Sequence, residues 1–360
     1  MKILFNNTIF FNQRFGGISR YFVNLINGLN DFNIEYLISS PIYKNIYLEK
    51  IKKNKIRGIY LKRFPNYKFI KNTNNILEKL ILRKFNPKII HDTYYSQNLY
   101  ENTKYKKVIT IHDLIHEKYK EIYNKNIIAK LNDKKKAIEN SDSIICVSES
   151  TKIDLLNTYN ISDKKVKVIY HGADHLDNVD IKNIDINIDK NFILFIGARS
   201  KYKNFELLIK AFSYSKRLKK NFNLICFGGG KFSKNEMEVI SKFNVLDNIK
   251  LIVKNDDATL KFLYSKAALL AVTSELEGFG LPILEALKNN CKVLASNIPV
   301  FKEIGKEYIN YFEKNNVDSL IYELERNIDS IIDSKNQLKH VENFKWSLCA
   351  KKTFELYDQT

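Results

Sequence analysis

Residues 269–287 read LLAVTSELEGFGLPILEAL, and this stretch holds the strongest local indication of how the chain folds. Leu269–Val272 is a short apolar run that predicts a buried strand. Gly278 and Gly280 allow a tight turn, and Pro282 favours the first turn of a helix, where its missing N–H costs nothing. The stretch therefore predicts a strand, a glycine turn and a helix in succession, the repeating unit of an α/β fold.

The same alternation extends along the rest of the chain. In the second half, strands are predicted at Phe192–Ile196, Asn223–Phe227, Ile249–Val253, Leu269–Val272 and Val293–Ala295. In the first half, they are predicted at Met1–Phe5, Ile34–Ser39, Ile89–His91, Val108–Ile111, Ile144–Val147 and Val166–Tyr170. Alternating strands and helices favour parallel, doubly wound sheets. A polar stretch, Asp174–Asp189, separates the two series, so the sequence predicts two α/β domains in tandem.

Length and composition agree with two soluble globular domains. The chain has 360 residues, of which 44% are hydrophobic and 28% charged, which excludes a disordered or fibrous protein. No apolar run approaches the roughly 20 residues of a membrane-spanning helix, and we expect a cytoplasmic protein. Cys146, Cys226 and Cys291 lie in apolar runs and Cys349 lies far from them, which predicts reduced, buried thiols.

Positive charge is concentrated in one segment. The formal net charge is +19. Lys44–Lys88, which we call the basic segment, contains 14 Lys and Arg residues against two acidic residues. Its apolar and aromatic residues alternate with the cations, a mixture suited to an anionic membrane surface. The alternative is a solvated surface in a lysine-rich protein.

The stretch at 274–287 also carries a candidate binding site. Exposed N–H groups at a helix start suit an anion or a polar sugar. The carboxylates of Glu277 and Glu285, eight residues apart, can accept hydrogen bonds from the hydroxyls of a sugar or a ribose. We expect both to face the same opening, with Glu285 in the first helical turn. The alternative for Glu285 is a carboxylate that only complements the helix dipole.

This segment resembles a signature of the retaining GT-B glycosyltransferases of the family-4, or "glycosyl transferases group 1", type, in which two glutamates flank a Phe-Gly-x-Pro turn. The resemblance covers nearly the whole chain. Its other matches are Phe15–Arg20, Thr110–Leu114, Ile145–Ser150, Val168–Gly172, Phe195–Phe205 and the tail from Phe344 to Tyr357. His171 departs from the asparagine that commonly precedes this glycine in the family.

The resemblance implies a GT-B fold, in which two Rossmann-like, doubly wound domains face each other across a cleft. It implies an acceptor-side domain at residues 1–172, completed by a C-terminal helix at about 343–360, and a donor-binding domain at 173–342. It also implies a retaining glycosyltransferase, which moves a sugar from a GDP- or UDP-type nucleotide sugar to a hydroxyl acceptor. The expected products are surface polysaccharide, lipopolysaccharide or another glycan.

The resemblance further implies roles for individual residues. The expected catalytic residues are His112, Glu277, Arg199 and Lys203. The expected donor-binding residues are Gly16, Gly17, Gly197, Arg199, Lys203, Phe279, Gly280, Leu281 and Glu285. Within this set, Glu285 would bind the ribose, and Arg199 and Lys203 would stabilise the growing charge of the leaving diphosphate.

Plainer interpretations of these residues stay open. Arg199 and Lys203 are two cations among 59 in the chain. His112 can be a strand-end histidine followed by a turn residue, Asp113, and Gly16-Gly17 can be a tight turn alone.

The sequence contains no Asp-x-Asp, so we expect no metal and no other cofactor. The expected partners are a nucleotide sugar, a glycan or lipid-linked acceptor and an anionic membrane surface, which would make the protein peripheral on the inner face of the membrane. Two alternatives are a non-catalytic nucleotide-sugar binder and a nucleic-acid-binding protein. The net charge suits the latter, although no nucleic-acid-binding motif is present.

Overall fold

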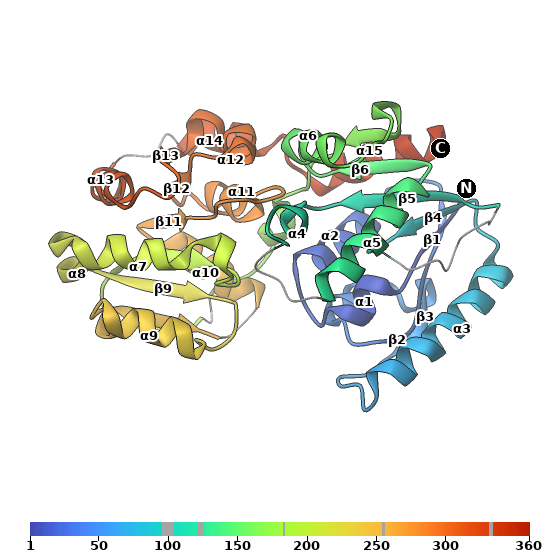
Figure 1. The fold of residues 1–360 in the computed structure, drawn as a ribbon, viewed down its shortest axis with the longest axis horizontal. Helices are drawn as coiled ribbons and strands as arrows, with labels where there is room; N and C mark the ends of the chain where they lie inside the picture. The colour runs from blue at the N-terminus through green and yellow to red at the C-terminus, as the bar shows by residue number, and fades with distance from the viewer. Residues whose placement is uncertain (96–103, 121–125, 183, 254–255, 331–333) are drawn as a thin grey trace. The chain divides into compact units, whose positions relative to one another are not determined.

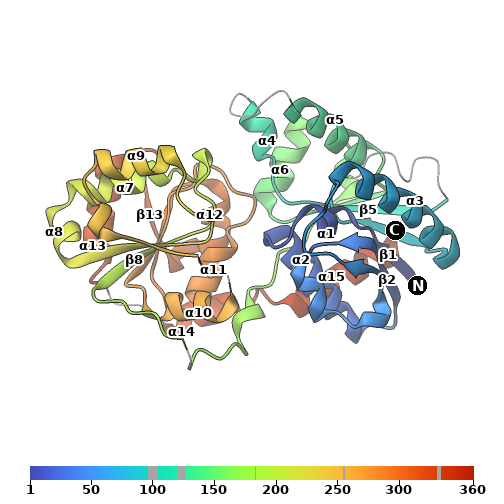
Figure 2. The ribbon, with the colours of Figure 1, turned by 90° about the horizontal axis from the view of Figure 1, so that it is seen from below.

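The computed structural model describes residues 1–95, 104–120, 126–182, 184–253, 256–330 and 334–360. The chain divides into two compact units, each with its own parallel sheet (Figures 1 and 2). Unit 1 comprises Met1–Gly172 and Trp346–Thr360, and unit 2 comprises Ala173–Lys345.

Unit 1 contains a seven-stranded parallel sheet in the order β3-β2-β1-β4-β5-β6-β7. Its strands are β1 (Lys2–Phe5), β2 (Glu35–Tyr43), β3 (Ile56–Tyr60), β4 (Ile89–Asp92), β5 (Lys106–Ile111), β6 (Ser143–Cys146) and β7 (Val166–Val168). From β1 the chain builds outward in one direction through β2 and β3. It then returns to the other side of β1 with β4, so the strand order reverses between β1 and β4.

Helices cover both faces of this sheet (Figures 1 and 2). They are α1 (Thr8–Asn12), α2 (Gly17–Gly28), α3 (Tyr67–Phe85), α4 (Ile115–Lys118), α5 (Asn126–Glu139), α6 (Glu149–Thr158) and α15 (Trp346–Gln359). Successive residues of β1 point to opposite faces. Ile3 and Phe5 join the core that includes α2 and α15, whereas Leu4 packs with Leu82 of α3.

The C-terminal helix α15 packs on α2 within unit 1. Phe32, just after α2, stacks on Phe354 with 4.8 Å between ring centroids. A Cβ atom on Gly28 would lie 2.7 Å from the Ala350 Cβ, so the two helices approach closely. Residues 343–345 belong to unit 2, because the Ala173 N–H donates to the Phe344 carbonyl at 2.9 Å and the Phe344 ring lies against Phe279.

Unit 2 contains a six-stranded parallel sheet in the order β10-β9-β8-β11-β12-β13. Its strands are β8 (Asn191–Ile196), β9 (Phe222–Phe227), β10 (Ile249–Ile252), β11 (Leu269–Val272), β12 (Val293–Ser296) and β13 (Asn310–Phe312). Its helices are α7 (Phe205–Tyr214), α8 (Lys216–Asn221), α9 (Lys234–Lys242), α10 (Asp257–Lys266), α11 (Leu281–Lys288), α12 (Pro299–Gly305), α13 (Val317–Asn327) and α14 (Ser334–Val341).

The prediction of two doubly wound, parallel α/β domains is confirmed, with two strands added. β3 was not predicted, because it is an exposed edge strand with a charged residue, Arg57, and a glycine, Gly58, among its five residues. β13 has only three residues. The predicted strands Ile144–Val147 and Val166–Tyr170 end earlier, at Cys146 and Val168.

All four cysteines are buried, and none of them forms a disulfide within the described residues, as expected from their apolar surroundings. Burial raises the pKa of the Cys226 and Cys291 thiols to about 12, which suppresses the reactive thiolate. Among the described residues, no helix combines the length and the apolar character that crossing a membrane requires.

Candidate functional site

The loops that follow β8 and β11 contact each other at the carboxyl edge of the sheet in unit 2. Lys203, in a 3-10 turn at Lys201–Lys203, forms an ion pair with Glu277. The same glutamate accepts a hydrogen bond from the Ser274 hydroxyl at 2.7 Å. The Thr273 hydroxyl donates to the Lys203 carbonyl at 2.8 Å, which joins the two loops a second time. The structure thus brings together two of the predicted catalytic residues, Lys203 and Glu277.

The ion pair lies next to the start of α11. Gly280 precedes the helix with φ = 98°, a left-handed conformation that side chains rarely adopt. Pro282 lies in the first turn, as predicted, and no side chain in the described part of the chain caps this helix start. Lys203, Glu277 and Gly280 also line a cavity of about 20 Å³, which is too small for a sugar. Ligand contact at these residues therefore requires the exposed side of the pair, whose side chains are 18% and 14% exposed.

Glu285 lies elsewhere on α11. It is the fifth residue of the helix, not part of its first turn, so that expectation is wrong. Its side chain is 5% exposed and its two oxygens have different partners. Oε2 accepts a hydrogen bond from the Tyr264 hydroxyl of α10 at 2.7 Å, and Oε1 lies 3.1 Å from Nε2 of His175. Glu277 and Glu285 therefore have separate sets of partners, whereas we expected them to share one opening.

Arg199 has its guanidinium directed at protein acceptors. Nε donates to Glu236 at 2.7 Å, and the terminal nitrogens donate to the carbonyls of Gly228, Gly229, Gly230 and Lys231 at 2.9–3.3 Å. The side chain is 1% exposed. Arg199 thus holds the glycine loop after β9 in place. We expected its guanidinium to contact a diphosphate, and this role in the loop was not part of that expectation. Gly197 lies nearby, and its N–H continues the β8–β9 ladder to the Phe227 carbonyl at 2.9 Å.

In unit 1, Gly16 and Gly17 form the start of α2, as predicted. Gln13 partly caps this helix start, because its Oε1 accepts from the Ser19 N–H at 3.2 Å. Among the described residues, a Cβ atom on Gly17 would meet no heavy atom within 4 Å, whereas one on Gly16 would lie 2.6 Å from the Gln13 side chain. The helix α2 is long enough, and the space beside Gly17 is open enough, for the N-terminus of α2 to receive an anion or a polar group.

His112 follows β5 and lies in a buried cluster of rings in unit 1. The Tyr21 ring meets it edge-on at 5.0 Å between centroids, and the His171 ring lies 5.9 Å away. Among the described residues, Nε2 of His112 has no hydrogen-bond partner. Burial lowers the pKa of His112 well below its usual value, so the ring is neutral at pH 7. The Asp113 carboxylate accepts from the Ile115 N–H at 3.1 Å, as a turn residue does.

The structure adds contacts of residues that the sequence marked weakly or not at all. His171 stacks on Trp346, and His91 bonds both Tyr357 and Thr110 through its two ring nitrogens. His91 lies in β4 and His171 lies just after β7, and these positions near strand ends were the only signal in the sequence. Tyr264, His175 and Glu236 gave none, because each lies tens of residues from the side chain that it contacts.

In the part of the chain that the structure describes, no three His, Cys, Asp or Glu side chains are grouped so that they could hold a metal ion. The residues of the two loops in unit 2 instead offer an ammonium, a carboxylate and the start of α11, where the described residues provide no side-chain cap.

Comparison with known proteins identifies the family. The model of "Glycosyltransferase Family 4" matches residues 15–175, and that of "Glycosyl transferases group 1" matches residues 177–345. The O-antigen chain mannosyltransferase RfbU of Salmonella typhimurium is 26% identical over 335 residues, which cover 88% of this chain and 89% of that protein.

Solved structures share the fold. Sucrose-phosphate synthase from Thermosynechococcus elongatus has a TM-score of 0.78 at 19% identity, covering 99% of this chain and 98% of that one. The Anabaena protein HepE, solved in complex with UDP-glucose, has a TM-score of 0.76 at 13% identity and covers both chains completely. With two family models that together span residues 15–345, and with its two parallel α/β domains, the chain belongs to the group 1 glycosyltransferases and has the GT-B fold.

Proposed function

We propose that this chain transfers a hexosyl group from a nucleoside-diphosphate sugar of the GDP or UDP type to a hydroxyl acceptor, with retention of anomeric configuration and without a metal. The product would be a surface polysaccharide or lipopolysaccharide. Membership of the family supports glycosyl transfer, and the similarity to a mannosyltransferase of O-antigen assembly supports this class of product.

One observation carries the proposal, namely the contact between Lys203 and Glu277 at the carboxyl edge of the sheet in unit 2. Open α/β sheets bind ligands at this edge. Loss of the sugar leaves negative charge on the diphosphate, which a fixed ammonium stabilises more in the transition state than in the ground state. Glu277 lies beside that ammonium and can accept hydrogen bonds from sugar hydroxyls. The Glu285 carboxylate can accept hydrogen bonds from the ribose hydroxyls once His175 has moved away from it.

The other residues have supporting roles in this proposal. The backbone of Phe279, Gly280 and Leu281 would hold the sugar through the uncapped start of α11. Arg199 would act by shaping the glycine loop that it holds. His112 would bind a sugar hydroxyl through Nε2, which a neutral imidazole can do as donor or acceptor. Gly16 and Gly17 would present the start of α2 to the donor.

Binding of nucleotides is the first test. UDP, GDP and ADP, and then their sugars, are titrated while thermal stability is recorded, since a ligand that binds the folded state raises its apparent stability. The proposal requires one nucleotide to bind and its sugar to be turned over, with the anomeric configuration of the product read by NMR. A chain that binds none of the nucleotides, or that binds one and never transfers its sugar, is not this enzyme.

A separate measurement tests the proposal that transfer needs no metal. Turnover should be unchanged after exhaustive EDTA treatment, because Lys203 and the helix start supply the positive potential at the leaving group. Loss of turnover that magnesium or manganese restores would contradict it.

We also propose that the acceptor side meets an anionic membrane surface through α3. Three apolar side chains at helical spacing on α3 are 55–68% exposed, namely Phe69, Ile76 and Leu80. The inward side of this helix is partly polar instead, because Glu78 is buried and accepts two hydrogen bonds from Asn7, at 3.1 and 2.8 Å. The basic segment, which contains α3, supplies cations for lipid phosphates, each contributing roughly 1 kcal/mol near such a surface.

Sedimentation with vesicles tests this surface. The chain should co-sediment with phosphatidylglycerol vesicles but not with phosphatidylcholine vesicles, and high salt should release it. Phe69→Ser with Ile76→Ser, or charge reversal at Lys52, Lys53, Lys55 and Arg57, should abolish binding. Ile153→Ser is the control, because Ile153 is an isoleucine of α6 with 58% exposure. Equal sedimentation of all variants, or none by the parent chain, would remove the membrane role.

A further inference from the structure

A second pocket lies in unit 1, at the point where the strand order of its sheet reverses. It has a volume of about 430 Å³ and is lined by residues that follow β1 and β4 and by residues of α3 and α5. Open α/β sheets bind ligands in the crevice at such a reversal. The volume falls within the roughly 300–1,000 Å³ of small-molecule sites. None of the predicted site residues lines this pocket.

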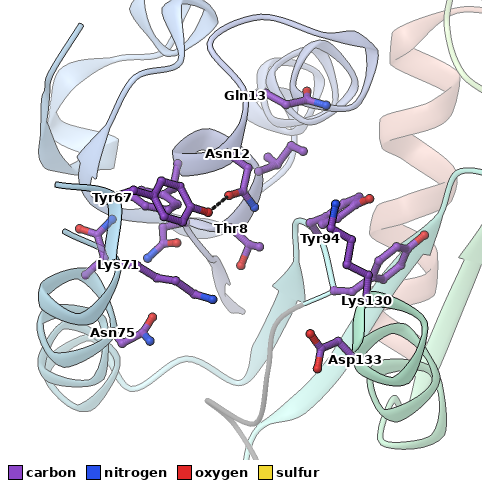
Figure 3. A pocket seen from close by; sticks show the side chains of 14 residues that line it. Thr8, Asn12, Gln13, Tyr67, Lys71, Asn75, Tyr94, Lys130 and Asp133 are labelled. Carbon is purple, nitrogen blue, oxygen red and sulfur yellow. Dashed lines mark hydrogen bonds between the residues drawn. The ribbon is translucent and has the colours of Figure 1, made fainter. Parts of the chain in front are cut away.

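One wall of the pocket is aromatic and fixed by packing. The Tyr67 ring lies 4.8 Å from the Phe11 ring, which stacks on Phe64 at the same distance. The Tyr67 hydroxyl donates to Oδ1 of Asn12 at 2.9 Å, the dashed line of Figure 3. Tyr94 lies on the other side of the pocket (Figure 3). Aromatic walls with a few amide and hydroxyl groups suit a sugar ring, which has apolar faces and hydroxyls on its rim.

Two cations and one carboxylate complete the lining. Lys71 of α3 and Lys130 of α5 approach from opposite sides, and Asp133 lies one helical turn from Lys130 (Figure 3). Among the described residues, neither lysine has an ion-pair partner. Asp133, in contrast, interacts with another group of the protein. The lining therefore carries more positive than negative charge, and both ammonium groups are available to an anion.

We propose that this pocket binds an acceptor sugar that carries an anionic group, either a phosphate or a carboxylate, with Lys71 and Lys130 on the anion and the tyrosines and amides on the ring. A glycosyl phosphate and an acidic sugar share this chemistry. The inference rests on the proposed function, because it identifies the pocket as the acceptor site. It adds a substrate class, an anionic glycan unit, that the family assignment does not specify.

The test compares four probes by calorimetric titration of the full chain, namely glucose 1-phosphate, glucuronic acid, methyl α-glucoside and inorganic phosphate. We expect glucose 1-phosphate or glucuronic acid to bind at least about tenfold more tightly than methyl α-glucoside and inorganic phosphate, since a charge-assisted contact contributes this much. The tighter of the two identifies the anionic group. Equal binding of methyl α-glucoside, equal binding of inorganic phosphate, or no saturable binding of either anionic sugar would overturn the proposal.

Variants locate the binding. Lys71→Met and Lys130→Met should each lower the affinity for the anionic sugar about tenfold. Lys68→Met is the matched control, because Lys68 is an exposed lysine of the same helix that does not line the pocket. Lys203→Ala, in unit 2, should keep the full affinity, which separates this pocket from the donor site. Affinity unchanged in Lys71→Met and Lys130→Met, or lost in Lys203→Ala, would overturn the proposal.

Nucleotide binding, measured with the same variants, separates this inference from the proposed function. Nucleotide binding without any binding of the anionic sugars overturns the pocket assignment alone. Binding of an anionic sugar that depends on Lys71, in a chain that binds no nucleotide, supports the pocket and contradicts the transferase.

Discussion

Lys203 and Arg199 lie four residues apart, yet their side chains have different surroundings. The Arg199 guanidinium is 1% exposed and donates to Glu236 and to successive carbonyls of the glycine loop. The Lys203 ammonium is 18% exposed and pairs with Glu277. Lys203 can therefore exchange a partner for a diphosphate, whereas Arg199 would first have to release the loop.

Lys203→Ala should lower turnover by on the order of 10²-fold, as loss of a donor at a developing negative charge does. Lys201→Ala is the control, because Lys201 belongs to the same 3-10 turn and is exposed. Steady-state kinetics on both variants, with the folded state checked by circular dichroism, measures the difference. A similar loss in Lys201→Ala would mean that the turn, not the Lys203 ammonium, matters.

At the scale of elements, the backbone before α11 determines where the signature residues lie. Gly280 has φ = 98°, and a Cβ atom there would lie 3.1 Å from the Phe301 ring. α3 is a second informative element, since the buried Glu78 and the exposed Phe69 are exceptions to the usual polarity of a surface helix. Gly280 lies at the proposed donor site, and α3 carries the proposed membrane surface.

Gly280→Ala should lower the free energy of unfolding by about 1–3 kcal/mol, because the left-handed conformation is strained for alanine and Phe301 must shift. Gly17→Ala should leave stability unchanged within about 0.5 kcal/mol, since a Cβ atom at Gly17 meets nothing within 4 Å. Urea denaturation of both variants gives the values. Equal stability of Gly280→Ala and the parent chain would show that the turn before α11 tolerates a side chain.

At the scale of the whole molecule, the two units differ in their buried histidines. Burial lowers the pKa of His91 and His171 to about 3 and lowers that of His112 as well, and all three belong to unit 1. In unit 2, burial also lowers the pKa of His340, although its hydrogen bond with the Ile304 carbonyl opposes this shift. Below pH 6.5 the unfolded chain binds protons that these folded residues do not, so stability falls as the pH falls.

Acidification from pH 7 to pH 5 should therefore destabilise unit 1 more than unit 2. Each of the three buried histidines contributes roughly 1.4 kcal/mol per pH unit below about pH 6.5, continuing down to its folded pKa. Hydrogen exchange read by mass spectrometry follows peptides of the two units separately. Unit 2 is therefore the control for unit 1 in the same experiment. Protection factors, corrected for the slower intrinsic exchange at lower pH, that fall equally in both units or do not fall in unit 1 would contradict a neutral histidine cluster.

The sequence by itself determined the fold class and the two series of strands, because apolar runs, glycine turns and helical spacing are local patterns. It also located the turn at Gly280, the helix start at Pro282 and the loop that carries Lys203. Weak edge strands such as β3 were missed, because an exposed strand carries no apolar run.

Only the tertiary structure decided which side chains meet. The pairs Arg199–Glu236 and Glu285–His175 join residues 37 and 110 positions apart, and no local pattern encodes such contacts. The pocket of unit 1 likewise gathers Asn12, Tyr67, Tyr94 and Lys130 from four separate segments. The reversal of strand order between β1 and β4 opens that pocket, and strand order is a property of the folded sheet, not of any stretch of sequence.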